Sequence, residues 1–504
     1  MRTSTAPALL FLLVLFTGIF LRAYDWMAIP FTHDEFSALF RTGYESFSRL
    51  IQEGVEQSDV HPAGVQVFLN YWIALVGSAP YLVKLPFLLA GLGSIYLTYR
   101  LGAYWYHETT GLVAAALVAS TQPMVMYSQI ARPYMSGIFL VLLAVWYLSL
   151  YLNQSRPSWG PYAGWILAAI GAAYNHYFSL LTIAFIGLLG LTMVSRAQLK
   201  AYCLSGILIL LGFAPHIPVT LTHLQKGGLD WLGRPETTFF WDFFRYLTHY
   251  NIVVMSLWLL LLIASLAFHF RYRKEPLDKR KRFRYLLFGA LVLPAIVGYS
   301  YSVLVEPVLQ FSSLMFALPL LVIGGCSFLP PLSYSFQGLV VALLLGLNTY
   351  TLIAERHHYD LHYNNRYKAT KNHFLQDLKR YGKDELLPLL SVDRRLKERW
   401  QDQSPTLRNA RLTRLSSLTA DSLNQCLKDS HKPYLAFATP EQMNWEKWWL
   451  AKTHYPYVLK VEHFFLGQYY LMARKPHPDT VGVVTQTIHW RDKHNQNEPK
   501  YKSM

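Results

Sequence analysis

Residues 6–36 read APALLFLLVLFTGIFLRAYDWMAIPFTHDEF, an apolar run followed at once by an acidic loop. The run can enter a bilayer as a helix, and no small-x-small cleavage pattern precedes Arg22, so we expect a retained span rather than a signal peptide. Adjacent carboxylates, here Asp34 and Glu35, are costly beside hydrocarbon unless a partner or a function offsets the cost. The stretch therefore predicts a membrane protein with chemistry in its first loop.

The composition divides the chain into two parts. Of 504 residues, 53% are hydrophobic and 15% charged, below the roughly 25% charged of an average soluble protein. The apolar runs fall within 1–353, where we expect one multi-span membrane domain with a large first outer loop at 22–81. Residues 354–476 read as a small soluble domain and 477–504 as a polar, loosely ordered tail.

Long apolar segments recur along the first part. Because a helix needs roughly 20 apolar residues to cross a bilayer, the pattern predicts about eleven spans. They are expected at 6–21, 82–101, 111–128, 134–152, 160–177, 178–195, 201–221, 252–270, 286–304, 309–329 and 336–353. The short apolar segment 62–78, interrupted by Gly64 and Gly77, is expected to lie in the interface instead.

Basic loops set the expected orientation. Loops rich in Lys and Arg stay in the cytoplasm, and the most basic one is 271–284. Counting spans from it puts the loops of Arg100, Arg156 and Arg196 on the same side. The Asp34–Glu35 loop and the segment after 353 then face outward. We therefore expect a multi-pass protein of the bacterial inner membrane with its active site and C-terminal domain extracytoplasmic.

In the C-terminal part, strand-like segments alternate with helix-like ones. The segments rich in branched and aromatic residues are 386–392, 433–439, 457–461 and 469–473, and the helix-like ones are 365–381, 420–428 and 440–453. This alternation predicts a small α/β domain.

The metal and cofactor signals are sparse. Three scattered cysteines are too few for a disulfide framework or a zinc cluster. The chain also lacks an Asp-x-Asp pair, which could hold a divalent ion for a nucleotide-sugar donor. No cofactor is therefore certain and a divalent cation stays open, while a sugar donor carried on a lipid phosphate is favoured.

Asp34 and Glu35 are the leading candidates for catalysis. A carboxylate at the membrane surface can accept the proton of a hydroxyl nucleophile, which makes Asp34 the candidate base. The alternative is helix capping, in which Thr32 or Asp34 begins an amphipathic helix. Capping would explain one acid more readily than two acids preceded by His33.

Other outward-facing polar residues are candidates for substrate binding. Arg132 can hold a phosphate through paired, charge-assisted hydrogen bonds, or it can anchor the interface with Tyr134 in the aromatic belt. His61 and His176 could contact substrate or simply satisfy local hydrogen bonds. The remaining candidates are His33, Glu306, and the cations Lys226 and Arg234 of a glycine-containing loop that could close over a phosphosugar.

The order of these motifs resembles that of the multi-span GT-C glycosyltransferases, in particular bacterial proteins similar to protein O-mannosyltransferases and lipid A aminoarabinose transferases. The matching stretches are His33-Asp34-Glu35, His61-Pro62, Lys84-Leu-Pro86, Tyr99-Arg100-Leu-Gly102 and Tyr127-Ser-Gln-Ile-Ala-Arg132-Pro-Tyr134. Where relatives carry Arg-Tyr in a late outer loop, Pro307 is followed here by Val-Leu-Gln-Phe. Either Lys226 or Arg234 would then replace that arginine, or the donor differs.

The resemblance implies that a sugar moves, with inversion, from a polyprenyl phosphate to an acceptor hydroxyl of a lipid, glycan or protein. Asp34 would be the base, Glu35 would assist it, and Arg132 and Tyr134 would meet the phosphate or the sugar. Two other classes stay open. One is a transporter or flippase of a lipid-linked saccharide, which would want ionisable groups near the bilayer midplane. The other is a non-catalytic envelope scaffold.

Nucleic acid is not an expected partner. The net charge of +16 is spread over short loops and the C-terminal part, where it is compatible with orientation in the membrane and with attraction to anionic lipids or phosphates.

Overall fold

The computed structural model describes the chain except for residues 1–5, 155–157, 228–231, 272–277, 393, 404, 409–411, 441–444, 465, 482–485, 493–496 and 504. Arg156 and the middle of the basic loop 271–284 thus lie outside the described residues. The chain forms two compact units, Met1–Met27 with Ser37–Arg356 and Ala28–Phe36 with His357–Met504. The acidic motif near the start of the chain is therefore part of the second unit.

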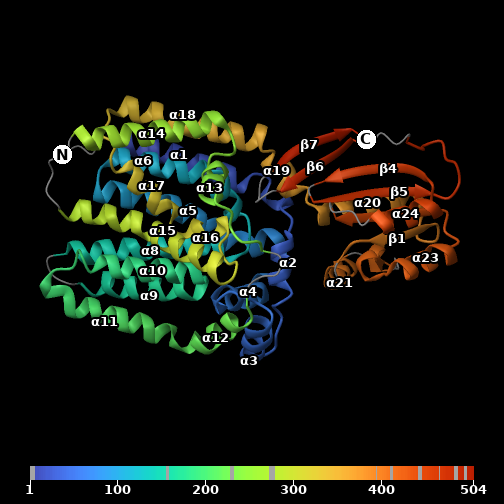
Figure 1. Cartoon of the computed structure of the whole chain (residues 1–504), viewed down its shortest axis with the longest axis horizontal. Helices are drawn as coiled ribbons and strands as arrows, with labels where there is room; N and C mark the ends of the chain where they lie inside the picture. Colours follow the sequence, from blue (N-terminus) through green and yellow to red (C-terminus); the bar gives the residue numbers. More distant parts are fainter. Residues whose placement is uncertain are drawn as a thin grey trace. The chain divides into compact units, whose positions relative to one another are not determined.

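The first unit is a bundle of apolar helices (Figure 1). Apolar residues all round a helix are typical of burial in lipid, where the backbone must satisfy its own hydrogen bonds. Along the bundle, α5 packs on α6 and α8, α8 on α9, and α10 on α15. The main helices of the bundle are α1 (Ala6–Ala23), α5 (Pro80–Trp105), α6 (Glu108–Ser120), α8 (Pro133–Asn153), α9 (Trp159–Asn175), α10 (Tyr177–Gly190), α11 (Arg196–Phe213), α14 (Ile252–Arg271), α15 (Lys279–Leu304) and α18 (Tyr334–Tyr350).

Six of the described helices are long and apolar enough to cross a membrane, or up to eight if each bent pair counts as one span. The protein is thus a multi-pass membrane protein, with fewer clear spans than the eleven we expected. One reason is that some apolar segments fold as shorter pieces. α10 has 14 residues, and the apolar stretch Phe311–Cys326 is divided into α16 (Phe311–Leu314), a 3-10 turn and α17 (Leu318–Cys326).

A buried arginine holds a break in one of these spans. α6 and α7 (Gln122–Ser128) meet at a bend of 64°. Arg22 at the end of α1 is fully buried. It donates hydrogen bonds to the carbonyl oxygens of Val118 (3.0 Å) and Ala119 (2.6 Å) and to Oγ of Ser128 (2.9 Å). The Arg22 guanidinium therefore satisfies carbonyl oxygens at the bend, so this buried ionisable group has a structural role.

Short helices gather at one end of the bundle. α3 (Phe47–Arg49), a π-helix over Leu50–Gln57, α4 (Ala63–Val76) and α12 (Ile217–Gln225) lie there (Figure 1). At 14 residues α4 is about 21 Å long, short of the roughly 30 Å of hydrocarbon in a bilayer. α4 and α12 both pack on the π-helix, which fixes the loop that joins the π-helix to α4.

The second unit is built on a five-stranded sheet of order β2-β1-β3-β5-β4. β1 runs parallel to β2 and β3, whereas β5 is antiparallel to β3 and β4. The strands are β1 (Leu386–Leu390), β2 (Thr413–Arg414), β3 (Tyr434–Pro440), β4 (Tyr457–Phe464) and β5 (Gly467–Ala473), with helices α20 (Arg366–Tyr381), α23 (Ala420–Asp429) and α24 (Trp445–His454). Each strand and helix predicted in this part has a counterpart within a few residues. β6 (Gln486–Asp492) and β7 (Asn497–Ser503) form a separate antiparallel pair.

Candidate functional site

Asp34 and Glu35 both lie in the first turn of α2 (His33–Leu39), but in different surroundings. Glu35 is fully buried. Its Oε2 accepts a hydrogen bond from the backbone N–H of Thr32 (2.8 Å), and its own N–H donates to Oγ1 of Thr32 (3.4 Å). This reciprocal pair is a capping box. The Asp34 side chain is exposed. Capping therefore accounts for Glu35 and leaves Asp34 as the acid without a structural explanation.

The residues around this acid are fastened to the start of α20. Nδ2 of Asn365 donates to the carbonyl oxygen of Phe31 (3.0 Å), and Nζ of Lys368 donates to that of Ala28 (2.8 Å). The ring of His33 stacks on Tyr367 and shares a hydrogen bond with its hydroxyl. His33, predicted to bind substrate, thus already has a partner inside the second unit.

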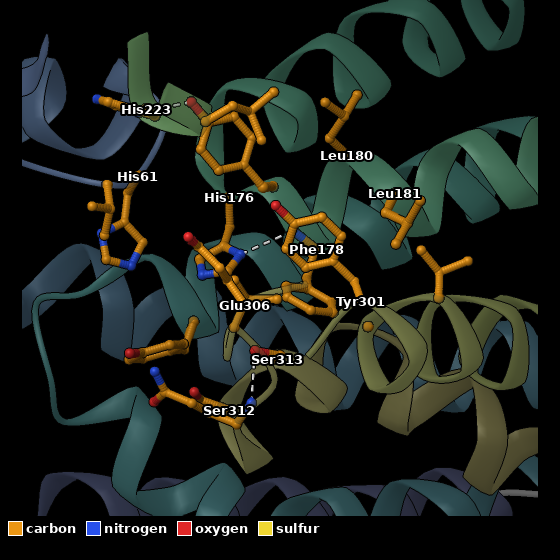
Figure 2. Close-up of a pocket in the computed structure, with 18 of the residues that line it drawn as sticks. His61, His176, Phe178, Leu180, Leu181, His223, Tyr301, Glu306, Ser312 and Ser313 are labelled. Carbon is orange, nitrogen blue, oxygen red and sulfur yellow. Dashed lines mark hydrogen bonds between the residues drawn. The ribbon is translucent and has the colours of Figure 1, made fainter. Parts of the chain in front are cut away.

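Within the first unit, a cavity of about 430 Å³ brings together four of the predicted site residues. They are His61 before α4, Tyr134 in the first turn of α8, His176 between α9 and α10, and Glu306 after α15. Figure 2 labels His61, His176 and Glu306. The rings of His61 and His176 lie 5.1 Å apart, and Tyr134 lies 6.2 Å from His176. Residues spread over most of the membrane part of the sequence therefore share one polar wall.

The other side of the cavity is apolar. Leu180, Leu181 and Ala184 line it from α10, and Val297 lines it from α15, the helix that packs on α10. Figure 2 shows Leu180 and Leu181 on the side away from His61. A cavity with one polar end and one apolar groove fits an amphiphilic ligand.

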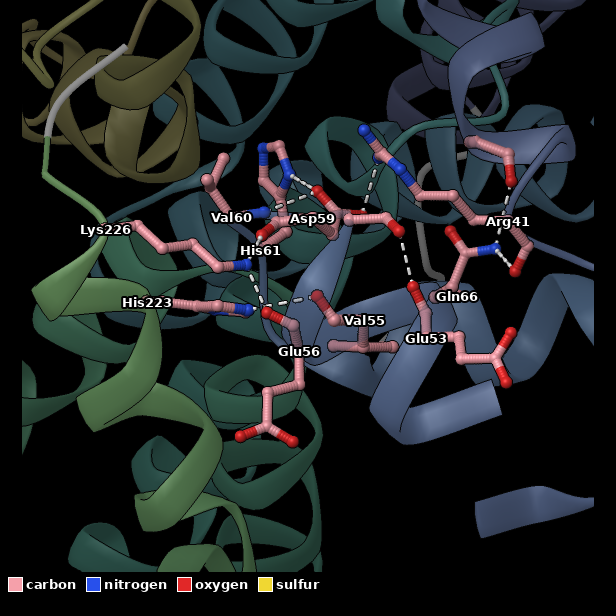
Figure 3. Close-up of polar contacts among 12 residues, drawn as sticks. Arg41, Glu53, Val55, Glu56, Asp59, Val60, His61, Gln66, His223 and Lys226 are labelled. Carbon is pink, nitrogen blue, oxygen red and sulfur yellow. Dashed lines mark hydrogen bonds and ion pairs between the residues drawn. The ribbon is translucent and has the colours of Figure 1, made fainter. Parts of the chain in front are cut away.

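Asp59, a residue that the sequence analysis missed, lies directly behind His61 and is only 6% exposed. Its Oδ1 accepts hydrogen bonds from Nδ1 of His61 (2.7 Å) and from the backbone N–H of Val60 (2.8 Å), and Oδ2 lies 2.9 Å from Nη1 of Arg41 (Figure 3). Burial alone would raise the pKa of this carboxyl group. The charges of His61, Arg41 and Arg132 outweigh burial and hold the pKa of Asp59 well below its usual range.

Further cations surround this carboxylate. Arg132 is the residue before α8, is 9% exposed, and lies close enough to Asp59 to act on its charge. Nζ of Lys226 donates to the backbone carbonyl oxygens of Glu56 and of Asp59, the latter at 3.1 Å. Arg234 is exposed and does not line the cavity, and residues 228–231 of the loop between the two cations, including Trp231, lie outside the described residues. Of the two predicted replacements for the late arginine, only Lys226 reaches the site.

His176 has a local role as well as a place in the cavity wall. Its Nδ1 accepts the backbone N–H of Phe178 at 3.0 Å and so caps α10. Nearby, the hydroxyl of Tyr177 shares a hydrogen bond with Nδ1 of His223 (2.8 Å), whose Nε2 lies 3.1 Å from the carbonyl oxygen of Val55. His176 therefore does satisfy a local hydrogen bond, as the alternative interpretation predicted, and its ring also lines the cavity.

Residues 60–218 match the family model described as "Dolichyl-phosphate-mannose-protein mannosyltransferase". The matched region contains His61, Arg132, Tyr134 and His176, and it begins after Asp34. The fold is similar over almost the whole chain to ArnT from Cupriavidus metallidurans. For the apo state the TM-score is 0.53 at 12% identity, covering 93% of this chain and 98% of that one. For ArnT bound to undecaprenyl phosphate it is 0.54 at 10% identity, covering 95% and 100%.

The predicted resemblance is confirmed at the level of the fold, which is that of ArnT. The S. cerevisiae protein O-mannosyltransferase Pmt1–Pmt2 complex bound to the sugar donor is more distant, with a TM-score of 0.32 at 16% identity over 50% of this chain and 38% of that one. No curated protein gives a sequence match.

The described part of the chain shows no metal centre. Among the residues that the structure describes, no group of three or more His, Cys, Asp or Glu side chains could hold a metal ion.

Proposed function

We propose that the protein is an inverting glycosyltransferase that moves a sugar from a polyprenyl-phosphate donor to an acceptor hydroxyl on the extracytoplasmic side of a bacterial inner membrane. The observation that carries this proposal is the two-sided cavity of the first unit. Its polar wall, with His61 and Glu306, would take the phosphate and sugar, and its apolar groove, with Leu181 and Ala184, would take the first isoprene units. The undecaprenyl phosphate bound to ArnT is a ligand of this kind.

The charges suit a phosphate leaving group. As the bond between sugar and phosphate breaks, negative charge grows on the phosphate oxygens, and cations already in place stabilise it. Arg132, Lys226 and Arg41 surround Asp59 behind the polar wall, so one carboxylate faces three permanent or near-permanent cations. Cations are therefore already in place beside the part of the cavity proposed for the phosphate.

The acceptor side requires a base. Inversion needs a group on the face of the sugar opposite the leaving phosphate that removes the proton of the attacking hydroxyl. Asp34 is the proposed base, because Glu35 is occupied in the cap of α2 and Asp59 is held ionised by cations. Glu306, Tyr134 and His176 are proposed to hydrogen-bond the sugar.

The same arrangement argues against transport. A flippase would need ionisable groups at the midplane that change partners, whereas Arg22 in the bundle is committed to carbonyl groups at the α6–α7 bend. We also propose a topology of about eleven spans, in which the short helices α10 and α16–α17 are counted. In this topology the cavity lies at the outer face of the membrane.

Lipid mass spectrometry on the purified full-length protein tests the proposal. The protein in nanodiscs is incubated with undecaprenyl-phosphate-linked pentose and hexose donors and a total envelope-glycolipid extract. Release of undecaprenyl phosphate together with a sugar-sized mass gain on an acceptor is expected. Movement of intact donor between leaflets without its consumption, or no binding and no consumption of any lipid-phosphate sugar, would overturn it.

A further inference from the structure

We propose that Asp59 is a positioning residue of the donor site, which orients His61 so that Nε2 of its ring meets the donor phosphate. This inference rests on the proposed function, because it assigns the polar wall to the phosphate. Asp59 does not line the cavity itself. It would act through His61, which does.

The geometry fixes which ring nitrogen is presented. Asp59 is ionised, so its oxygens can only accept hydrogen bonds. With Nδ1 of His61 at 2.7 Å from Oδ1, the proton between them belongs to the ring. Nδ1 is thus committed to Asp59, and Nε2 is the ring atom left for a ligand in the cavity (Figure 3).

The same carboxylate holds the neighbouring cations at short range. Oδ2 contacts Arg41 and the backbone oxygen accepts from Lys226, so Asp59 ties two separate segments to the loop before α4. Without the carboxylate, Arg41, Arg132 and Lys226 would repel one another in a poorly solvated place. Asp59 therefore keeps the cations together beside the polar wall.

An ordinary stabilising ion pair would not need this arrangement. Burying a carboxylate is costly unless its hydrogen bonds are satisfied, and replacing such a pair by apolar residues often costs a protein nothing. By contrast, Glu53 on the π-helix pairs with Arg49 at 2.8 Å on the surface, with 38% of its side chain exposed. This nearby pair reaches no cavity and serves as a matched control.

Amide substitutions of His61 separate its two ring nitrogens. The side-chain amide of His61→Gln reaches the place of Nε2, and that of His61→Asn reaches only the place of Nδ1. If Nε2 meets the phosphate, His61→Asn should lose at least about tenfold in affinity for undecaprenyl phosphate, and His61→Gln should lose clearly less. The reverse order, or equal losses, would overturn the assignment of Nε2.

Asp59→Asn tests the positioning role in the full-length protein in nanodiscs. It should raise KM for the donor at least about tenfold while changing kcat less, with Glu53→Gln unchanged and Asp59→Glu giving partial rescue. A donor KM equal to that of the wild type would overturn the role. If Asp59→Asn fails to elute as a folded protein, Arg41→Gln is measured instead, because it leaves the contact between Asp59 and His61 in place. Arg41→Gln should raise the donor KM less than His61→Asn does. An equal or larger rise would overturn the positioning role of Asp59.

Failure of the proposed function gives a different result. In that case the wild-type protein itself neither binds undecaprenyl phosphate nor consumes a donor. If the wild type does both and only the His61 and Asp59 variants behave otherwise than expected, the positioning role alone is wrong.

Discussion

The backbone N–H of Ala63 donates a hydrogen bond to Nε2 of His216 at 3.0 Å, across 153 positions of sequence. His216 is 3% exposed, and its Nδ1 lies 3.0 Å from Oγ1 of Thr220. Since Nε2 accepts, the ring proton is on Nδ1 and points to Thr220. A distant helix thereby holds the first residue of α4, which immediately follows the His61-Pro62 motif.

His216→Ala should destabilise the protein by about 1–3 kcal/mol, because the N–H of Ala63 loses its partner in a buried place. The apparent unfolding midpoint in detergent should fall accordingly. Thr220→Val keeps the contact between His216 and Ala63, so its unfolding midpoint should fall less. A His216→Ala protein with the wild-type midpoint would show that the bond contributes little.

Asp34→Asn should abolish sugar transfer, since an amide cannot accept the proton of the acceptor hydroxyl. Insertion into the membrane and binding of undecaprenyl phosphate should be unchanged. Glu35→Gln preserves an oxygen for the capping box with Thr32 and should keep most of the activity. Turnover retained by Asp34→Asn, measured by release of undecaprenyl phosphate, would show that Asp34 is not the catalytic base.

Arg132→Ala should weaken use of the donor more than use of the acceptor. The cation lies close to Asp59, in the part of the site proposed for phosphate, and its loss should cost at least about 1.5 kcal/mol of donor binding. Arg234→Ala, at an exposed position away from the cavity, is the control and should behave as the wild type. Equal losses for donor and acceptor would count against a phosphate role for Arg132.

Ala184→Trp should block the apolar groove between α10 and α15. Activity with undecaprenyl-linked donors should fall by an order of magnitude or more, whereas a donor with a short isoprenoid chain should be used nearly as before. Leu210→Trp, on α11 at a position 70% exposed and outside the cavity lining, is the control and should leave both activities unchanged. If Ala184→Trp affected short and long donors alike, the groove would not hold the chain.

Acid should destabilise the fold through Asp59. Its pKa in the folded state is below that of an unfolded Asp, about 3.9, so its stabilising effect is fully present above that pH. The effect is lost as the pH falls below about 4 toward the pKa of the folded protein, because the unfolded chain takes up the proton first. Unfolding monitored between pH 3 and pH 6 should show a weaker acid dependence in Asp59→Asn, and an unchanged dependence would mean that other carboxylates determine it.

Local patterns predicted much of this architecture. Apolar runs located the helices of the bundle, and the alternation after residue 365 located the strands and helices of the second unit. Windows of hydropathy could not foresee the bend between α6 and α7, because a buried arginine from another helix supports it. Six to eight described helices are long and apolar enough to span, fewer than the eleven predicted, because length along the sequence does not reveal where an apolar stretch divides into shorter helices.

The candidate site was predicted less completely. His61, Tyr134, His176 and Glu306 were chosen as outward-facing polar residues, and they line one cavity. Asp59 carried only the weak signal of standing two residues before His61, and Arg41 carried none, because their contact depends on how the π-helix folds back. Neighbours in sequence could not be told apart either: Asp34 and Glu35 look alike until the cap of α2 is seen.

The attachment of Ala28–Phe36 to the start of α20 has a consequence for biosynthesis. Phe31 and His33 find their hydrogen-bond partners 334 residues later, at Asn365 and Tyr367. A ribosome that has already delivered every span to the membrane has not yet supplied what secures the acidic turn. A chain that stops before Asn365 would therefore keep its apolar helices but lack the partners that hold the turn containing Asp34.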